Sequence, residues 1–541
     1  MTRNALRLVV AALVLHLLLI QPNHPDAATW GALALFPLEL PVILLGLAAV
    51  PPGRWANALR VVLVAVLSLI AVLKAADYAM YSALSRGFNP VSDLVLIEAG
   101  MRLVLGAIGP VQTLAAAAAA LLAFCAVALA VWWSTGVWTR LRVSAPAAVG
   151  LATVAVFSAG VAAAEVGHAM GRWSLPVSPP GAAFTARVGM ERIGMVRSTL
   201  ADLRAFTAAA SNDPLAGRPG LLRAIDRDVL VVFVESYGRT SLDTPLYAGT
   251  HRATLAEADA RLGALGLSRR SGLLRAPTRG GQSWLSHATF ANGLWVDNQT
   301  SYRAVLASSR MTLFHAAAQA GFRTAAVMPQ ITMAWPEASV MGFETVLGAS
   351  DLGYAGLPFN WVTMPDQFTF TALDRLLRDD PDDRPLFVQI ALGSSHAPWV
   401  PVPEIVPWDQ VGDGTIFDAM AQAGDPPDVV WRDRDRVRDQ YRQAIDYALR
   451  VIFDYAALHA ADPPLIFVVG DHQAARFVAL DERPDVPVHV IGPASLVSAT
   501  ADWGWNEGLL PDDAAVAMQM DRMRDLILQS YAAEAAQGGD S

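Results

Sequence analysis

The first third of this chain concentrates its apolar residues into stretches near the length of a membrane-spanning helix, residues 8–20, 30–50, 61–73, 111–134 and 145–164. A helix of about 20 apolar residues spans the hydrocarbon core of a bilayer, and a helix satisfies its own backbone hydrogen bonds there. Two of the stretches reach that length only with their weakly polar flanks. We therefore predict five transmembrane helices, which is consistent with the 54% hydrophobic residues of the whole chain.

The arginines beside these stretches indicate their orientation. The positive-inside rule places short arginine-bearing segments in the cytoplasm, and here these carry Arg3 and Arg7, Arg54 and Arg60, and Arg140 and Arg142. Residues 21–29 contain no Lys or Arg. The amino terminus is therefore predicted to be cytoplasmic, with everything beyond residue 165 outside. Lys74, at the end of the third stretch, is expected to extend toward the membrane surface, with a buried functional pair with Asp77 as the alternative.

Composition and patterning divide the chain into three parts. We predict a membrane domain over residues 1–165, a linker with an amphipathic helix over residues 166–223, and an outer domain over residues 224–541. The net charge of −9 argues against a nucleic-acid partner. Cys125, the single cysteine, falls in the fourth apolar stretch, so the outer domain can form no disulfide.

The outer domain opens with DVLVVFVESYGR, residues 228–239. Its continuous apolar run, rich in β-branched residues, is typical of a central parallel strand covered on both faces. Glu235 follows directly where the run stops. Ligands bind at the carboxyl ends of strands in open α/β sheets, so Glu235 is a candidate metal ligand, with a role in capping the next turn as the alternative.

Further strands alternate with helical segments through the rest of the domain. Strands are predicted at residues 324–328, 386–392 and 465–469, and helices at 309–320, 368–378 and 436–459. His396 follows the second of these strands, and Asp471 and His472 follow the third. The pattern predicts an α/β fold with a mostly parallel sheet flanked by helices.

A second motif, RAPTRGGQSWLSHATF at residues 275–290, places Ser283 after two glycines and before a helical pattern. Glycines permit a tight turn, and a helix amino terminus favours an anion, which suits a nucleophile that attacks phosphorus. The alternative is an ordinary serine helix cap.

Glu235, Asp471 and His472 each follow a buried apolar strand, so they can converge at one edge of the sheet. Together with the Ser283 oxygen they make a four-coordinate set suited to zinc or manganese. A metal ion there would lower the pKa of the serine hydroxyl and polarise a phosphoryl oxygen.

The motifs VESYGR, GGQSW, SSHAPW and VVGDHQ resemble those of the lipoteichoic acid synthase and phosphoethanolamine transferase branch of the alkaline phosphatase superfamily. The resemblance implies an alkaline-phosphatase-like fold and one metal ion bound by Glu235, Asp471, His472 and the nucleophile, Ser283. It also implies that His396 contacts the substrate phosphate. Trp335 resembles a tryptophan of the glycerol-phosphate groove in the synthases.

The sequence departs from this branch at several positions. Serine replaces the usual threonine nucleophile, which leaves Ser286 as a rival. The formylglycine signature is missing around Ser283, which argues against an ordinary sulfatase. Glu337 falls near an expected arginine, so the headgroup stays open between phosphoethanolamine and phosphoglycerol.

Four more residues receive predictions, two of them with alternatives. Arg279 is close enough in sequence to neutralise a phosphate. His287 could face the site or lie on the helix surface, and His489 could contact a leaving group or belong to the core. Asp366 is expected to cap the helix that follows it.

The resemblance predicts a monomeric phosphotransferase in a bacterial inner membrane, multi-pass, with its catalytic domain in the periplasm. Ser283 would take the headgroup phosphate of a phospholipid donor and pass it to an envelope glycan or lipid acceptor, with His396 holding or protonating the phosphate oxygens. The alternatives are a phosphoric- or sulfuric-ester hydrolase of the same superfamily and a catalytically inactive lipid-binding regulator.

Overall fold

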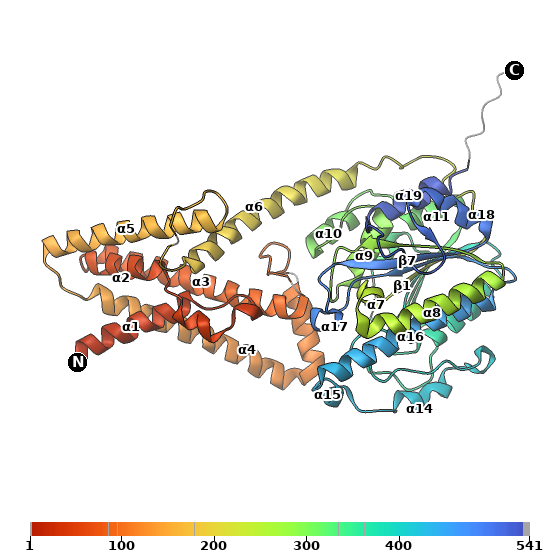
Figure 1. Cartoon of the computed structure of the whole chain (residues 1–541), viewed down its shortest axis with the longest axis horizontal. Coiled ribbons are helices and arrows are strands. Elements are labelled where there is room, and N and C mark those ends of the chain that lie inside the picture. Colours follow the sequence, from red (N-terminus) through yellow and green to blue (C-terminus); the bar gives the residue numbers. More distant parts are fainter. Residues whose placement is uncertain are drawn as a thin grey trace, which may run out of the picture. The chain divides into compact units, whose positions relative to one another are not determined.

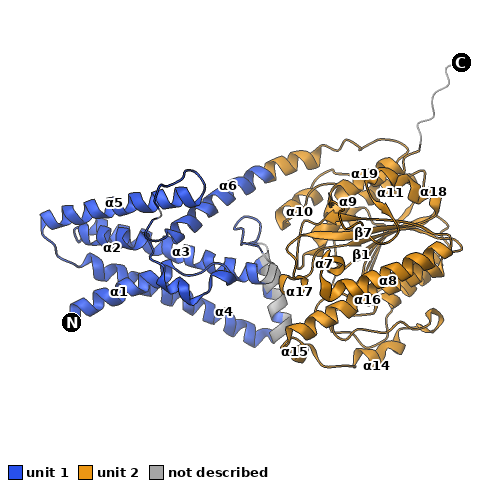
Figure 2. Cartoon of the chain, viewed as in Figure 1, with its two compact units in different colours: residues 1–202 blue, residues 203–541 orange. Residues whose placement is uncertain are grey.

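A computed structural model describes residues 3–533 of the protein, except residues 85, 95, 178, 334 and 362. The chain forms two compact units, residues 1–202 and 203–541 (Figure 2). The boundary falls inside helix α6, Phe184–Ser211, which contains the helical pattern expected at residues 186–210. The last eight residues of the predicted outer domain lie outside the described residues.

The first unit contains a helix in each of the five apolar stretches (Figure 1), α1 Arg3–Leu19, α2 Glu39–Ala49, α3 Arg54–Leu84, α4 Leu96–Thr139 and α5 Ala145–Ala169. Within the described residues, three segments are long and apolar enough to cross a membrane, residues 54–82, 109–139 and 145–169. They fit a membrane-anchored protein. Helix α1, with 17 residues, and helix α2, with 11, are not among these segments, so three of the five predicted transmembrane stretches are supported.

The predicted stretch at residues 30–50 is not one continuous helix. Trp30–Ala34 forms a 3₁₀ turn, and α2 begins only at Glu39. Pro37 lies between them and pairs with Ala182 through an isolated bridge. A proline disfavours helical backbone at the residue before it and lacks an N–H donor, so the helix begins after Pro37.

The prediction that Lys74 extends to the membrane surface is wrong. Its side chain is buried, and its Nζ donates to the Leu19 carbonyl at 2.9 Å and to Thr185 Oγ1 at 2.8 Å. Asp77, one turn further along α3, pairs with Arg192 of α6. The start of α6 therefore supplies polar partners to α3, and the pattern of α3 alone could not reveal them.

The second unit is built on a mixed sheet of nine strands that is mostly parallel in its centre. The strand order is β4-β3-β5-β1-β6-β7-β2-β8, with β9 paired to β2. The strand β1 lies between β5 and β6, parallel to both, while β7 and β2 are antiparallel. The strands are β1 Val229–Val234, β2 Ser268–Arg275, β3 Arg323–Met328, β4 Thr345–Gly348, β5 Leu386–Ala391, β6 Leu465–Gly470, β7 Asp485–Gly492, β8 Asn506–Glu507 and β9 Met518–Gln519.

Helices cover both faces of this sheet, which confirms the predicted α/β fold with a mostly parallel sheet flanked by helices. They are α7 Thr240–Asp243, α8 Pro245–Ala264, α9 Ser283–Asn292, α10 Gln299–Leu306, α11 Leu313–Ala320, α12 Ala338–Met341, α13 Asp366–Leu373, α14 Asp418–Ala421, α15 Pro427–Val430, α16 Arg434–Leu458, α17 Arg476–Ala479, α18 Ala494–Val497 and α19 Arg522–Ser530. Helices α8 and α16 lie side by side on one face (Figure 1).

Alternate residues of β1 enter the two cores. Leu230, Val232 and Val234 pack in the cluster that contains Leu255 of α8 and Ile452 of α16. Val229, Val231 and Phe233 pack in the cluster that contains Phe314 of α11 and Ile527 of α19. Side chains alternate between the two faces of a strand, and both faces of β1 are buried, so β1 is apolar throughout. The first polar side chain, Glu235, follows at its carboxyl end.

Candidate active site

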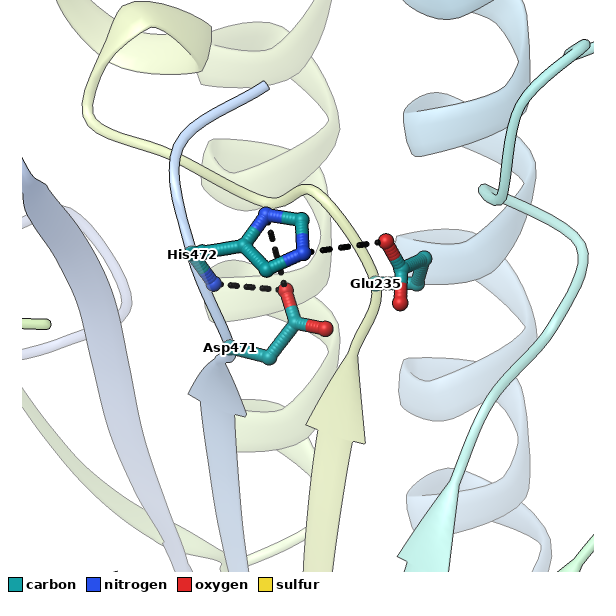
Figure 3. Close-up of side chains that lie close together, drawn as sticks. All are labelled: Glu235, Asp471 and His472. Carbon is teal, nitrogen blue, oxygen red and sulfur yellow. Dashed lines mark hydrogen bonds and ion pairs between the residues drawn. The ribbon is translucent and has the colours of Figure 1, made fainter. Parts of the chain in front are cut away.

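Three acidic and basic side chains meet at the carboxyl ends of β1 and β6 (Figure 3). His472 Nε2 lies 3.3 Å from Glu235 Oε1, and His472 Nδ1 lies 3.7 Å from Asp471 Oδ1. Ligand atoms of all three residues lie within 4.8 Å of one another, and all three side chains are buried. The predicted convergence of Glu235, Asp471 and His472 is the geometry observed here.

The charges of this cluster depend on one another. Burial opposes ionisation of Glu235, but the His472 imidazole holds the pKa of that carboxyl well below its usual range. Burial, with the negative charge of Glu235 beside it, holds the pKa of Asp471 well above its usual range. Burial also disfavours charge on His472, yet the two carboxylates raise its pKa to about 9. The cluster therefore favours a positive charge at its centre.

The donor set fits a divalent metal ion. His472 Nδ1 lies 3.1 Å from the Gln473 carbonyl, so Nδ1–H donates there and Nε2 faces Glu235, where a metal ion would take the place of its proton. Asp471 Oδ1 accepts hydrogen bonds from the backbone N–H groups of Ser236 at 2.8 Å and His472 at 2.6 Å. Two oriented carboxylates and an oriented imidazole are ligands that zinc and manganese accept.

Ser283 adds a hydroxyl to this cluster. Its Oγ donates to Glu235 Oε2 at 2.8 Å and lies 3.2 Å from His472 Nε2. Ser283 is the first residue of α9 and its side chain does not cap the helix; Gln282 occupies the cap position with φ 68°. Gly280 and Gly281 also have positive φ, 72° and 141°, conformations that favour glycine. This tight turn holds the Ser283 hydroxyl against the two ligands.

Ser286, the rival serine, lies elsewhere on α9. It is buried, and its Oγ is 3.5 Å from Thr278 Oγ1. It is not among the residues that line the cavity beside Ser283.

A cavity of about 310 Å³ opens beside Ser283. Its lining includes three further residues predicted from the sequence, His287, Trp335 and His396. His396 Nδ1 lies 2.6 Å from the Ala397 carbonyl, which leaves Nε2 as the nitrogen available to a substrate. Burial lowers the pKa of His287 to about 3, so its imidazole is neutral. The structure thus brings most of the predicted site residues to one cavity.

Two predicted substrate-binding residues lie away from this cavity. Arg279 donates to the Glu482 carbonyl. His489 is buried in the middle of β7, with Nδ1 2.8 Å from Ser271 Oγ and Nε2 3.1 Å from the Tyr237 hydroxyl. Both ring nitrogens of His489 are therefore used within the core, which corresponds to the core alternative.

Asp366 supports the site in a way that its sequence context did not suggest. It does not cap α13, which has Pro365 at its cap position. Its Oδ1 instead accepts from the backbone N–H groups of Gly393 and Ser394, both at 2.9 Å. Burial raises the pKa of Asp366 to about 6. Asp366 therefore holds the loop after β5 that carries His396.

Glutamines are the cavity residues that the sequence analysis missed. Gln282, Gln330 and Gln389 all line the cavity. Gln282 lies between Gly281 and Ser283, and Gln389 is a polar residue within the apolar strand FVQIA, a signal that could have drawn attention to it. Glutamine has no chemistry specific to phosphoryl transfer, so neither position stood out.

The chain was compared with protein-family models, curated proteins and solved structures. The sulfatase family model matches residues 227–486, which include Glu235, Ser283, His396, Asp471 and His472. A search of curated proteins gave no match.

Several solved structures are similar to the chain. Lipoteichoic acid synthase LtaP from Listeria monocytogenes is 11% identical with a TM-score of 0.36, over 54% of this chain and 72% of that one. The C-terminal periplasmic domain of EcEptC from Escherichia coli in complex with Zn is 16% identical with a TM-score of 0.35, over 56% and 82%. Phosphoglycerol transferase GacH from Streptococcus pyogenes, in complex with sn-glycerol-1-phosphate, is 12% identical with a TM-score of 0.36, over 62% and 91%.

The matched region begins just before β1 and ends within β7, so it spans the central parallel strands and both metal-ligand motifs. The similarity to the sulfatase family model therefore covers the part of the second unit that holds these five residues.

Proposed function

We propose that the protein is a membrane-anchored phosphotransferase that moves the headgroup phosphate of a phospholipid, through a covalent phospho-serine, to a hydroxyl of an envelope glycan or lipid. The observation that carries the proposal is the position of Ser283 Oγ, within 3.2 Å of both Glu235 and His472. A serine oxygen in contact with two metal-ligating groups is an activated nucleophile. The motif resemblance to lipoteichoic acid synthases and phosphoethanolamine transferases supports the same chemistry.

A divalent ion, zinc or manganese, held by Glu235, Asp471 and His472 would lower the pKa of the Ser283 hydroxyl and neutralise charge on the phosphate. The residues of the chain position the nucleophile and the phosphate. The turn at Gly280 and Gly281 fixes the Ser283 oxygen at the start of α9, whose free backbone N–H groups favour an anion.

The transfer would proceed in two displacements at phosphorus. First, the Ser283 hydroxyl gives up its proton and its oxygen bonds to the phosphorus, while the bond to the diacylglycerol oxygen breaks and that leaving oxygen takes a proton. The acceptor hydroxyl then loses its proton and bonds to the phosphorus, while the bond to the Ser283 oxygen breaks and that oxygen takes a proton again. His396 faces the cavity through Nε2 and would hold or protonate the phosphate oxygens.

Hydrolysis is the second candidate function, because the sulfatase family model matches the catalytic region. A hydrolase would form the same phospho-serine but release the group to water. An acceptor product linked through phosphate supports the transferase, and free headgroup phosphate in its place supports the hydrolase.

Release of diacylglycerol tests the proposal. We would incubate the full-length protein with labelled phospholipids and zinc or manganese. Ser283→Ala should lower release at least about a thousandfold, because the nucleophile is removed. Ser286→Ala is the matched control and should retain activity, since its hydroxyl lies outside the cavity. Activity in Ser283→Ala with loss in Ser286→Ala would reverse the assignment, and no release from any common phospholipid would reject the lipid donor.

A periplasmic active site requires the orientation that the arginines indicate. A reporter that is active only outside the cytoplasm should work when fused after Ala210 and fail when fused after Arg142. The opposite pattern would overturn both the orientation and the proposed access to the outer leaflet.

A further inference from the structure

The first unit contains a cavity of about 450 Å³ between helices α2, α5 and α6. Its walls are mostly apolar, because α5 contributes small side chains and the other two helices contribute larger ones. They include Val42 and Ile43 of α2, Ala159 and Ala163 of α5, and Met190 of α6. A concave apolar site of this size suits a hydrophobic ligand.

The cavity lies at one end of the membrane helices. Its lining includes Glu39, the first residue of α2, and Arg172 and Trp173, which follow the end of α5. The Trp173 ring packs on Gly167, where a Cβ atom would lie 1.9 Å from the nearest ring atom, and its Nε1 donates to the Ala164 carbonyl at 3.0 Å. Tryptophan is enriched where hydrocarbon meets water, so a lipid chain in the cavity would have its polar end here.

This polar end has an unpaired carboxylate oxygen. Glu39 Oε1 accepts from the Ala186 N–H at 2.9 Å, whereas Oε2 is buried and has no hydrogen-bond partner among the residues that the structure describes. Lys74 is close enough to attract this carboxylate, but its Nζ donates to the Leu19 carbonyl and to Thr185 Oγ1. A buried oxygen without a partner is costly, so a ligand that donates a hydrogen bond to Oε2 is favoured.

Two opposite charges line the cavity in the described part of the chain, Glu39 and Arg172. The Arg172 side chain is exposed, and a guanidinium group binds phosphate well. A headgroup with an ammonium and a phosphate complements both residues, because the ammonium can donate to Glu39 Oε2 while the phosphate contacts Arg172. A phospholipid with a glycerol headgroup would satisfy Arg172 but would bring no positive charge to Glu39.

We infer that this cavity binds one phospholipid with an ammonium headgroup, as a component of the first unit that the reaction does not consume. The acyl chain would lie along the alanines of α5. The inference does not rest on the proposed function, because the cavity and Ser283 belong to different units and lipid binding is measured without turnover.

Native mass spectrometry of the full-length Ser283→Ala protein tests the site in a background that lacks the proposed nucleophile. The delipidated protein in detergent would be titrated with phosphatidylethanolamine and phosphatidylglycerol of matched chains. One phosphatidylethanolamine per chain should bind at least about tenfold more tightly than phosphatidylglycerol, because a hydrogen bond to a charged group discriminates by about that factor.

Adding Glu39→Gln should abolish this preference. The amide keeps the shape of the side chain and an acceptor for the Ala186 N–H, but it loses the negative charge. Glu165→Gln is the matched control, because Glu165 Oε2 also accepts from a backbone N–H near the start of α6, that of Ala183 at 3.0 Å, and Glu165 does not line the cavity. This control should keep the preference.

Filling the apolar part of the cavity is a second, independent test. Adding Ala163→Phe places a large side chain in the cavity and should weaken the binding of both lipids at least about tenfold. Ala152→Phe is the matched control, since Ala152 is an exposed alanine of α5 that does not line the cavity. It should bind phosphatidylethanolamine as the parent does.

Equal binding of the two lipids, a preference for phosphatidylglycerol, or no binding of either one would overturn the inference. A preference that survives Glu39→Gln, or unchanged binding in Ala163→Phe, would also overturn it. The proposed function fails by a different result, namely no diacylglycerol release by the wild-type protein.

Discussion

His472 and His489 are both buried histidines, one just after β6 and the other within the neighbouring strand β7, yet they have different surroundings. His472 follows the end of β6, and its Nε2 faces Glu235 and Ser283. His489 lies in the middle of β7, with its two nitrogens bonded to Ser271 and Tyr237. Burial of a histidine does not by itself indicate a functional role. The position of the residue relative to the end of the strand decides whether its ring nitrogens can contact a substrate or a metal ion.

The parallel and the antiparallel parts of the sheet differ in the same way, in whether their side chains can reach the candidate active site. The parallel strands β5, β1 and β6 end at one edge, so the loops after them carry His396, Glu235, Asp471 and His472 to one place. The strand β7 runs antiparallel to β6, so its carboxyl end lies at the opposite edge. The parallel order of these strands therefore brings the candidate catalytic side chains together, whereas the neighbouring antiparallel strands supply side chains to the hydrophobic core.

The largest effect is expected from removing a ligand at the parallel edge. Asp471→Ala should abolish both activity and stoichiometric zinc or manganese, because it removes one carboxylate of the metal set. The matched control is Asp485→Ala on β7, where the carboxylate pairs with Arg239 at 3.3 Å. Metal analysis of the purified proteins decides the comparison, and full occupancy in Asp471→Ala would contradict it.

His396 should have the next largest effect. His396→Ala should lower kcat/KM for diacylglycerol release about 10²- to 10⁴-fold, the usual range for a general acid or base. Metal content should not change, because His396 is not among the three clustered ligands. Loss of metal in this variant would place His396 in the metal set instead.

Asp366, which holds the loop after β5, is expected to make the stability of the protein depend on pH. Burial raises its pKa to about 6 from the usual 3.8, so folding favours the protonated acid. Its contribution to stability is full below pH 4 and is lost as the pH rises through about 6. Asp366→Asn should therefore become more stable than wild type by up to about 3 kcal/mol between pH 4 and pH 7. Unfolding by urea at several pH values measures this difference, and a constant difference would refute it.

The smallest effect is expected at the antiparallel strand. His489→Leu should lower the free energy of unfolding by about 1 to 3 kcal/mol, because the Tyr237 hydroxyl loses its partner. Metal content and kcat/KM should stay near wild type. A large loss of activity in a folded, metal-replete His489→Leu protein would show that the antiparallel region takes part in the chemistry.

Sequence patterns predicted the central strands well because burial on both faces leaves a continuous apolar run, as in β1, β5 and β6. They did not reveal β2, whose sequence SRRSGLLR carries two arginines and a glycine. Its strand conformation depends on pairing with β7 over eight residues, and such pairing between distant segments leaves no local pattern.

The metal cluster was predictable because each ligand follows directly after a strand. The glutamines and Asp366 were not, since their roles come from contacts across the fold. Asp366 bonds residues 27 and 28 positions away in the chain. The prediction for Lys74 was wrong for the same reason, because its hydrogen-bond partner Thr185 lies 111 residues further along the chain.

The most direct test of the central claim is the detection of a phosphorylated headgroup on Ser283. The full-length protein would be mixed with phospholipid and metal, quenched in acid, digested and examined by mass spectrometry. The account predicts a headgroup phosphate attached to the peptide at Ser283, and its loss in Ser283→Ala. Diacylglycerol release without any adduct on Ser283, or an adduct on Ser286, would contradict it.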